Sequence, residues 1–216
     1  MRIIVNKKFK HNILKNKTTA NIINTFGLNA ITEQVVFENF QFDLQPNKLY
    51  YICGYSGSGK SVLLREIAEQ AKEKYNITYI EKWQNLDIPN LHLIEFFPEI
   101  DTDKKLRYLS KCGLGEAWKF ISKYETLSDG EKFRFILYKT LMELKDKENS
   151  VLIFDEFCST LDRITAKSIA AGLKKLTKEL GITLIVATAH DDIGEYINAD
   201  VNIVKEYSKN VDYKTN

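Results

Sequence analysis

Apolar residues along this chain gather in short runs that alternate with segments of helical periodicity. The runs at 49–53, 151–155 and 182–187 have the length and the apolar character of strands that are buried on both faces. Asn76-Ile77-Thr78-Tyr79-Ile80 is a further predicted strand. After the first run, Leu63, Leu64 and Ile67 recur at the spacing of one helix face. Strands that alternate with helices in this way predict an α/β domain built on a mainly parallel sheet.

Helical periodicity also marks the second half of the chain. Between residues 100 and 125, Asp101 is placed to cap a helix and Gly113 to end one, so we interpret residues 100–127 as a small helical lobe. Ser128 would cap a longer helix. A further helix is predicted from about Thr165 to Leu180, where Gly181 follows as a stop.

Composition narrows the class of protein. The 216 residues are 44% hydrophobic and 28% charged, which is an ordinary balance for one globular domain. No apolar run approaches the roughly 20 residues of a membrane-spanning helix, and the N-terminus turns polar too early for a signal peptide. Three scattered cysteines form no C-x-x-C pair, which favours a reducing compartment. We therefore expect a cytoplasmic protein.

The net charge of +2 hides an uneven distribution. Six of the basic residues fall within the first 32, and Glu33 is the first acid. We interpret residues 1–32 as a basic N-terminal extension and residues 33–216 as the folded domain. A solvated edge explains the basic residues best, although an acidic partner, an anionic membrane or nucleic acid is the alternative.

The strongest chemical signal lies between the first strand and its helix. Gly54-Tyr55-Ser56-Gly57-Ser58-Gly59-Lys60-Ser61 matches the pattern G-x-x-x-x-G-K-[ST] in full. Three glycines let backbone N–H groups turn inward around phosphates, and the following helix N-terminus adds its dipole. We expect Lys60 to reach the β- and γ-phosphates and the Ser61 hydroxyl to ligate Mg²⁺. The loop predicts an ATP site.

A second signal is the strand at 151–155, which ends in two acids. Asp155 would complete the Mg²⁺ shell, usually through water, if its strand lies beside the phosphate-loop strand. Glu156 points elsewhere in a strand and would polarise the attacking water. The loop and the acids together predict an ATP hydrolase.

Taken with three further motifs, the chain resembles the ATP-binding-cassette (ABC) ATPase superfamily. Leu127-Ser128-Asp129-Gly130-Glu131 is similar to its signature motif, usually Leu-Ser-Gly-Gly-Gln. Ser159-Thr160-Leu161-Asp162 looks like its D-loop, and His190 looks like its switch histidine. The resemblance implies a P-loop NTPase fold with a mixed β-sheet core, an antiparallel β subdomain and a reduced helical lobe.

The resemblance also implies a mechanism. Two copies would close head to tail over two ATP molecules, with Ser128 and Gly130 of one copy binding the γ-phosphate held by the other. His190 would sense that phosphate, and Asp162 would link the two sites. These roles are implied by the family and rest on the order of the motifs.

The chain departs from the family pattern at several positions. Asp129 replaces a glycine and places an anion near the γ-phosphate, and Glu131 replaces the glutamine. The glutamine loop is unclear: Gln84 is the only glutamine between the phosphate-loop helix and the signature, and it would be a metal ligand. No adenine-stacking aromatic is evident. Phe26 is a candidate, but it falls in a predicted helix, where core packing is the better interpretation.

A narrower resemblance is to the ABC-type ATPase module that is found fused to a predicted acetyltransferase domain. We favour an ATPase whose closure acts on a cytosolic protein or nucleic acid, because the segment 61–126 is short for a lobe that grips a membrane permease. The alternative is the nucleotide-binding subunit of a membrane ABC transporter. A chromosome-maintenance head lacks room here for its coiled coil, and a small-molecule kinase needs no signature motif.

Overall fold

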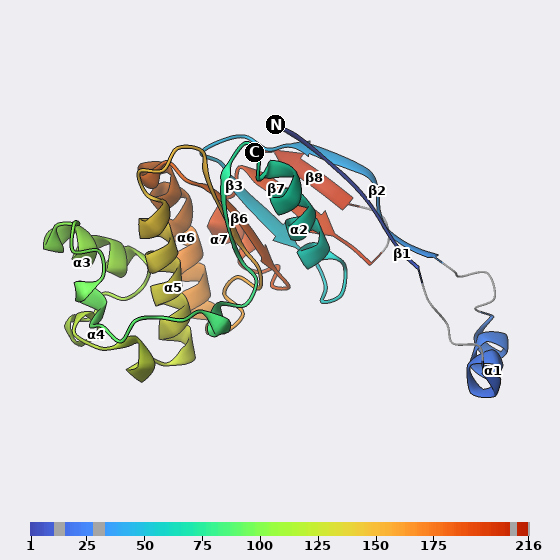
Figure 1. The fold of residues 1–216 in the computed structure, drawn as a ribbon, viewed down its shortest axis with the longest axis horizontal. Coiled ribbons are helices and arrows are strands. Elements are labelled where there is room, and N and C mark those ends of the chain that lie inside the picture. The colour runs from blue at the N-terminus through green and yellow to red at the C-terminus, as the bar shows by residue number, and fades with distance from the viewer. Residues whose placement is uncertain (11–15, 28–32, 208–210, 216) are drawn as a thin grey trace.

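The main sheet of the molecule has six strands, in the order β4-β5-β6-β3-β7-β8 (Figure 1). The computed structural model describes residues 1–10, 16–27, 33–207 and 211–215. Five strands run parallel to one another: β3, β4, β5, β6 and β7. The sixth, β8, pairs antiparallel with β7. The bounds are β3 (Leu49–Cys53), β4 (Asn76–Ile80), β5 (Ser150–Phe154), β6 (Thr183–Thr188), β7 (Val201–Lys205) and β8 (Val211–Thr215).

The predicted parallel strands are confirmed. Asp155 was predicted beside the phosphate-loop strand, but β6 lies between β3 and β5. The two strand ends still meet at one edge of the sheet, because parallel strands share the direction of their carboxyl ends.

A second sheet consists of β1 (Arg2–Lys10) and β2 (Glu33–Asp43), which are antiparallel. Ile3 and Val5 of β1 are fully buried. Residues 2–10 therefore pack as part of the body, and the predicted division at residue 32 separates two strands that pair with each other. A basic extension was the natural interpretation of Lys7 and its neighbours, yet Lys7 forms an ion pair of 2.7 Å with Glu66 of α2 (Lys60–Ala71).

Each face of the main sheet has its own apolar core. Alternate residues of β3 point to opposite faces, so Tyr50 and Ile52 join one core while Leu49 and Tyr51 join the other. The first core lies between the sheet, α2 and the β1–β2 sheet. The second is covered by α5 (Asp129–Leu144) and α6 (Arg163–Leu180), which lie side by side (Figure 1). Both long helices begin near the edge of the sheet where the motifs meet.

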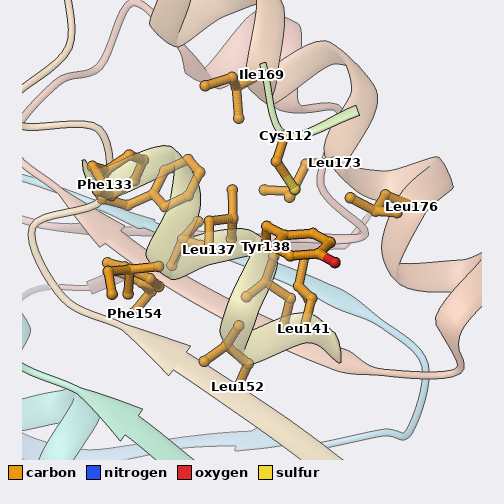
Figure 2. Close-up of a cluster of buried hydrophobic side chains, with 14 of the residues drawn as sticks. Cys112, Phe133, Leu137, Tyr138, Leu141, Leu152, Phe154, Ile169, Leu173 and Leu176 are labelled. Carbon is orange, nitrogen blue, oxygen red and sulfur yellow. The ribbon is translucent and has the colours of Figure 1, made fainter. Parts of the chain in front are cut away.

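Packing around α5 explains its stability. Phe133, Leu137, Tyr138 and Leu141 of this helix lie between β5 and α6, as Figure 2 shows. These side chains are fully buried, and burial of one large apolar side chain contributes about 1.5–3 kcal/mol. Ser128 caps the helix as predicted, and Glu131 completes the capping box. The start of α5 is therefore held in place from both its cap and its core.

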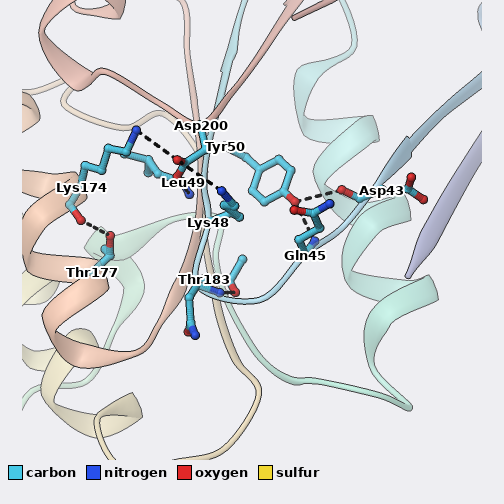
Figure 3. A network of polar contacts seen from close by, with 10 residues as sticks. Asp43, Gln45, Lys48, Leu49, Tyr50, Lys174, Thr177, Thr183 and Asp200 are labelled. Carbon is cyan, nitrogen blue, oxygen red and sulfur yellow. Dashed lines mark hydrogen bonds and ion pairs between the residues drawn. The ribbon is translucent and has the colours of Figure 1, made fainter. Parts of the chain in front are cut away.

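Polar contacts fix the opposite end of β3 (Figure 3). The Leu49 N–H donates to Asp200 Oδ2 at 2.9 Å, and Lys174 Nζ lies 3.0 Å from Asp200 Oδ1. Burial raises the pKa of Asp200, but the Leu49 and Lys174 contacts outweigh it and hold that pKa below its usual value. The Tyr50 hydroxyl donates to Asp43 O at 2.9 Å. This strand is thereby tied to α6 and to the β2 turn.

The remaining helices form a small lobe and a short arm. The lobe contains α3 (Thr102–Lys111), which Asp101 caps as predicted, and α4 (Ala117–Phe120); short 3-10 turns are η2 (Trp83–Asn85), η3 (Leu93–Glu95) and η4 (Tyr124–Thr126). The helix α7 (Gly194–Ile197) follows β6. The arm helix α1 (Lys17–Phe26) has no buried residue among its described side chains. No helix in the described part of the chain is long and apolar enough to cross a bilayer.

Candidate functional site

The site is a cavity of about 300 Å³ at the carboxyl ends of β3, β5 and β6. Ligands of parallel α/β sheets bind at this edge, because helix N-termini and loops converge there. Its lining combines loop residues, strand-end acids and part of the β1–β2 sheet: Phe9, Gln34, Val36, Ser56, Gly57, Gly59, Lys60, Ser61, Val62, Asp155, Glu156, Thr188 and Ala189. The phosphate loop and the two acids, predicted separately from the sequence, share one cavity.

Two glycines of the loop are required by their surroundings. At Gly54 any side chain would overlap the carbonyl of Lys205. Gly59 has a φ of 107°, and a Cβ there would lie 2.6 Å from Val36. Only glycine takes up such a backbone without strain. The tight turn therefore brings the loop close to β7 and leads directly into α2.

Lys60 lies on its own loop. Its Nζ donates to Gly54 O at 2.7 Å and to Tyr55 O at 2.8 Å. Burial lowers the pKa of Lys60, while the charge of Asp155 acts in the opposite direction. Lys60 lines the cavity with its charge near that of Asp155. Its ammonium group is therefore placed to turn toward a bound phosphate.

The two acids differ in environment. Asp155 is only 4% exposed, and its Oδ1 accepts a hydrogen bond of 2.9 Å from the Glu156 N–H. Glu156 is exposed and has a φ of 50°, which is strained for a residue with a side chain. The left-handed turn ends β5, and both acids line the cavity; that their carboxylates point in different directions stays a prediction.

The donor set suits Mg²⁺ in part. The Ser61 hydroxyl and the Asp155 carboxylate line the same cavity, and Mg²⁺ is usually held by one or two protein oxygens, substrate phosphates and water. The described residues contain no cluster of three or more His, Cys, Asp or Glu that would hold a metal ion alone. Gln84, the third predicted ligand, is exposed in η2 and does not line the cavity. Its predicted metal role is not supported by this position.

The signature residues lie outside the cavity. Ser128 is exposed at the N-cap of α5, and Gly130 follows in its first turn. Arg134 holds this turn in place by donating to Gly130 O at 3.2 Å and to Gly113 O at 2.6 Å. Asp162 is likewise an N-cap, of α6, and accepts from the N–H groups of Ile164 and Thr165. Ser128, Gly130 and Asp162 therefore do not line the cavity of their own chain.

His190 lies next to the cavity without lining it. Its N–H donates to Thr188 Oγ1 at 3.2 Å, and its carbonyl accepts from the Tyr51 hydroxyl at 2.6 Å. Burial, and then the charge of Arg163, lower the pKa of His190. This lowering favours the neutral form of the imidazole.

Sequence reasoning missed three lining residues from the second sheet. Phe9, Gln34 and Val36 come from β1 and β2, and Phe9 is an aromatic ring beside the phosphate loop. The signal for β1 was weak, because Ile3 and Val5 are separated by apolar Ile4 and not by a polar residue. Phe26, the earlier candidate, does lie in a helix, but it is 72% exposed, so core packing is wrong for it.

Fold and site together define a P-loop nucleotide-binding cassette. A family model described as ABC transporter matches residues 37–159, more than half of the chain. The chain belongs to the ABC transporter family.

Several relatives are similar over most of this chain. The methionine import ATP-binding protein MetN of Corynebacterium efficiens is 28% identical, over 89% of this chain and 60% of its own length. The phosphonates import ATP-binding protein PhnC 2 of Oceanobacillus iheyensis is 26% identical, over 88% of this chain and 84% of its own length. The chain thus spans about 60% of the length of the methionine-import relative.

Solved structures share the fold. The dimeric bacterial ABC transporter cassette MJ0796 covers 100% of this chain with a TM-score of 0.63 at 18% identity, and 98% of that cassette is covered. A post-hydrolysis form of the same cassette, bound to ADP and phosphate, gives a TM-score of 0.64 at 19% identity. The predicted fold class is therefore confirmed.

Proposed function

We propose that this chain binds Mg-ATP in the cavity beside β3 and hydrolyses it to ADP and phosphate. The observation that carries the proposal is the meeting of Lys60, Asp155 and Glu156 in one cavity beneath a glycine-rich loop. Loop N–H groups and the α2 N-terminus supply positive potential, which suits a polyphosphate. Ser56, Gly57, Ser58, Gly59 and Ser61 would form the rest of this cradle with Gly54.

Each side chain has a role that its environment favours. Lys60 would leave its loop carbonyls and pair with a phosphate. Glu156, exposed to the cavity, would orient and deprotonate the attacking water. Asp155 and Ser61 would hold Mg²⁺, which when bound neutralises the charge on the phosphates. Phe9 would stack on the adenine, because it is the aromatic ring that lines the cavity.

The second half of the site would come from a second copy. Ser128 and Gly130 lie exposed or half-exposed at a helix N-terminus, where N–H groups favour an anion. The related cassette MJ0796 is dimeric. A head-to-tail homodimer would bring these residues to the other copy's γ-phosphate and place Asp162 and His190 between the two sites.

A membrane permease is the partner that the relatives favour. Both curated relatives described above are import ATP-binding proteins. We therefore propose a membrane permease as the partner, in place of the cytosolic protein or nucleic acid expected from the sequence. These relatives also lend no support to the narrower resemblance to the acetyltransferase-fused module. The lobe at residues 100–127 would be the region that contacts such a partner.

A cytosolic protein or nucleic acid stays the second candidate. It is favoured by the position of Gln84 outside the cavity and by the short segment 61–126. In the family pattern this segment and its glutamine loop link the nucleotide to the permease. Here the segment is short and the glutamine lies outside the cavity.

One experiment distinguishes the two partners. Glu156→Gln is loaded with Mg-ATP and used as bait for detergent-solubilised membranes and for cytosol, with Lys60→Ala as the matched blank. Enrichment of an integral membrane protein by the ATP-loaded bait alone supports the transporter subunit. Enrichment of a cytosolic protein or nucleic acid instead supports the second candidate. A bait that neither retains ATP nor dimerises contradicts the proposed ATPase.

A further inference from the structure

A short segment that follows β7 lies against the phosphate loop. We call residues 205–207 the loop brace. The carbonyl of Lys205 fills the space where a side chain on Gly54 would be. The Tyr207 hydroxyl donates a hydrogen bond of 3.0 Å to Ser56 O. The brace therefore contacts the loop at two points, and neither Lys205 nor Tyr207 lines the cavity, whereas Ser56 does.

Two exposed tyrosine rings reinforce this contact. Tyr55 of the loop and Tyr207 of the brace are stacked, with ring centroids 5.3 Å apart and an angle of 6° between the planes. The side chains are 66% and 67% exposed. Stacked aromatic pairs are stabilising beyond the apolar area that they bury. The stack holds the Tyr207 ring in the position from which its hydroxyl reaches Ser56.

Hydrogen bonds to the loop carbonyls come from two sources. Lys60 donates to Gly54 O and to Tyr55 O, whereas Tyr207 donates to Ser56 O. The ammonium group of Lys60 has three protons to share between these carbonyls and a bound phosphate, so its bonds to the loop would change when nucleotide binds. Tyr207 has no such competing role, because it does not line the cavity. We therefore expect its hydrogen bond to remain when nucleotide binds.

The bond to Ser56 O fixes the direction of one N–H group. In a planar trans peptide the carbonyl of one residue and the N–H of the next point in opposite directions. Ser56 O faces Tyr207 outside the cavity, so the Gly57 N–H of the same peptide points away from the brace. Gly57 itself lines the cavity. The peptide is therefore oriented as a phosphate donor.

We propose that Tyr207 is a positioning residue for nucleotide, which acts by holding the Ser56–Gly57 peptide with its N–H toward the phosphates. Tyr55 supports it by stacking. The inference rests on the proposed function, since it concerns the same phosphate site. It adds a residue from the β7–β8 side of the molecule, outside every motif that the sequence displayed.

The test is Tyr207→Phe in the full chain, which keeps the ring and the stack but removes the donor. Loss of one hydrogen bond to a loop that stays ordered should raise the Kd for Mg-ATP about threefold to tenfold. We expect KM to rise with it and kcat to change less than about twofold, because the interaction binds substrate and transition state alike. Binding is measured by calorimetry, and turnover by phosphate release.

Tyr213→Phe is the matched control. It makes the same chemical change on β8, and the nearest aromatic contact of Tyr213 is Phe42, not the loop. This variant should bind Mg-ATP like the wild type. An unchanged Kd in Tyr207→Phe, or an equal rise in the Tyr213→Phe control, would overturn the proposal. A lower melting temperature without a change in Kd would also overturn it, since that is what a merely structural contact gives.

A second variant tests the stack. Tyr55→Ala should raise the Kd about twofold to fivefold, and combining it with Tyr207→Phe should add less than the sum, because both changes weaken one hydrogen bond. Full additivity would contradict the coupling. Failure of the proposed function has a different signature: the wild-type chain would not bind Mg-ATP, or Lys60→Ala would bind it equally well.

Discussion

The two halves of the nucleotide site are built in opposite ways. The phosphate-loop half is complete within one chain, because the loop, Asp155 and Glu156 line one cavity. The signature half, with Ser128 and Gly130, begins an ordered helix but contributes nothing to that cavity. The phosphate-loop half can hold a ligand with the residues of one chain. The signature half would need a ligand that is bound to another copy. This difference is what the proposed head-to-tail homodimer predicts, because each copy would supply its signature residues to the phosphate loop of the other.

Both halves are nevertheless held in place by contacts with neighbouring residues. The loop is held by Lys205 and Tyr207, and the signature turn by the capping box and by Arg134. A preorganised helix start loses little entropy when an anion arrives. The signature turn is therefore already formed before a ligand binds. Variants can test the two halves separately.

The largest effect is expected from Lys60→Ala, which disables the complete half. Removal of the ammonium should weaken Mg-ATP binding about a hundredfold or more and abolish turnover, since charge-assisted bonds to phosphate are strong. Calorimetry measures the affinity. Lys72→Ala, an exposed lysine just after α2, is the control and should bind normally. Wild-type affinity in Lys60→Ala would mean that the loop is not the phosphate site.

Glu156→Gln should separate binding from chemistry. We expect kcat to fall by about 10²–10⁴ while Mg-ATP stays bound, because the amide cannot accept the proton of water. Light scattering should then show an ATP-dependent dimer. Glu148→Gln, an exposed acid before β5, should behave as the wild type. Wild-type turnover in Glu156→Gln would remove this residue as the general base.

Ser128→Arg tests the signature half alone. Because Ser128 does not line its own chain's cavity, Mg-ATP affinity of the monomer should stay within about twofold. Introduced into Glu156→Gln, the bulky side chain should prevent the ATP-dependent dimer. Ser168→Arg, at an exposed position of α6, should not. A normal dimer with Ser128→Arg would refute the head-to-tail arrangement.

The smallest effect is expected on the pKa of His190. Arg163 of α6 pairs with Asp192 after β6, and its charge helps to lower the pKa of His190. Arg163→Gln should therefore raise that pKa, so that the imidazole becomes protonated at higher pH than in the wild type. NMR titration of the histidine ring measures it. Lys167→Gln, whose residue also lies near Asp192, should leave the His190 titration unchanged.

Local patterns predicted a large part of the fold. Strands β3, β5 and β6 are largely apolar runs, whereas β4 mixes polar and apolar residues. Ser128 and Asp101 cap helices as their side chains suggest. The helix predicted from Thr165 begins two residues earlier, because Asp162 caps it. Strands β7 and β8 were not predicted, since only Val201, Ile203 and Lys205 are buried there. Their pairing depends on partners far away in the chain.

The sequence by itself determined which motifs are present: the loop at 54–61 and the two acids, whose predicted roles follow from residue type and spacing, and the signature serine, whose role the family resemblance implies. Only the tertiary structure decided what surrounds them. It brought Phe9 to the cavity, left Gln84 outside it, and laid Tyr207 on the loop. The physical reason is that motifs are local, whereas contacts between strands and loops distant in sequence are set by which faces of the sheet are buried.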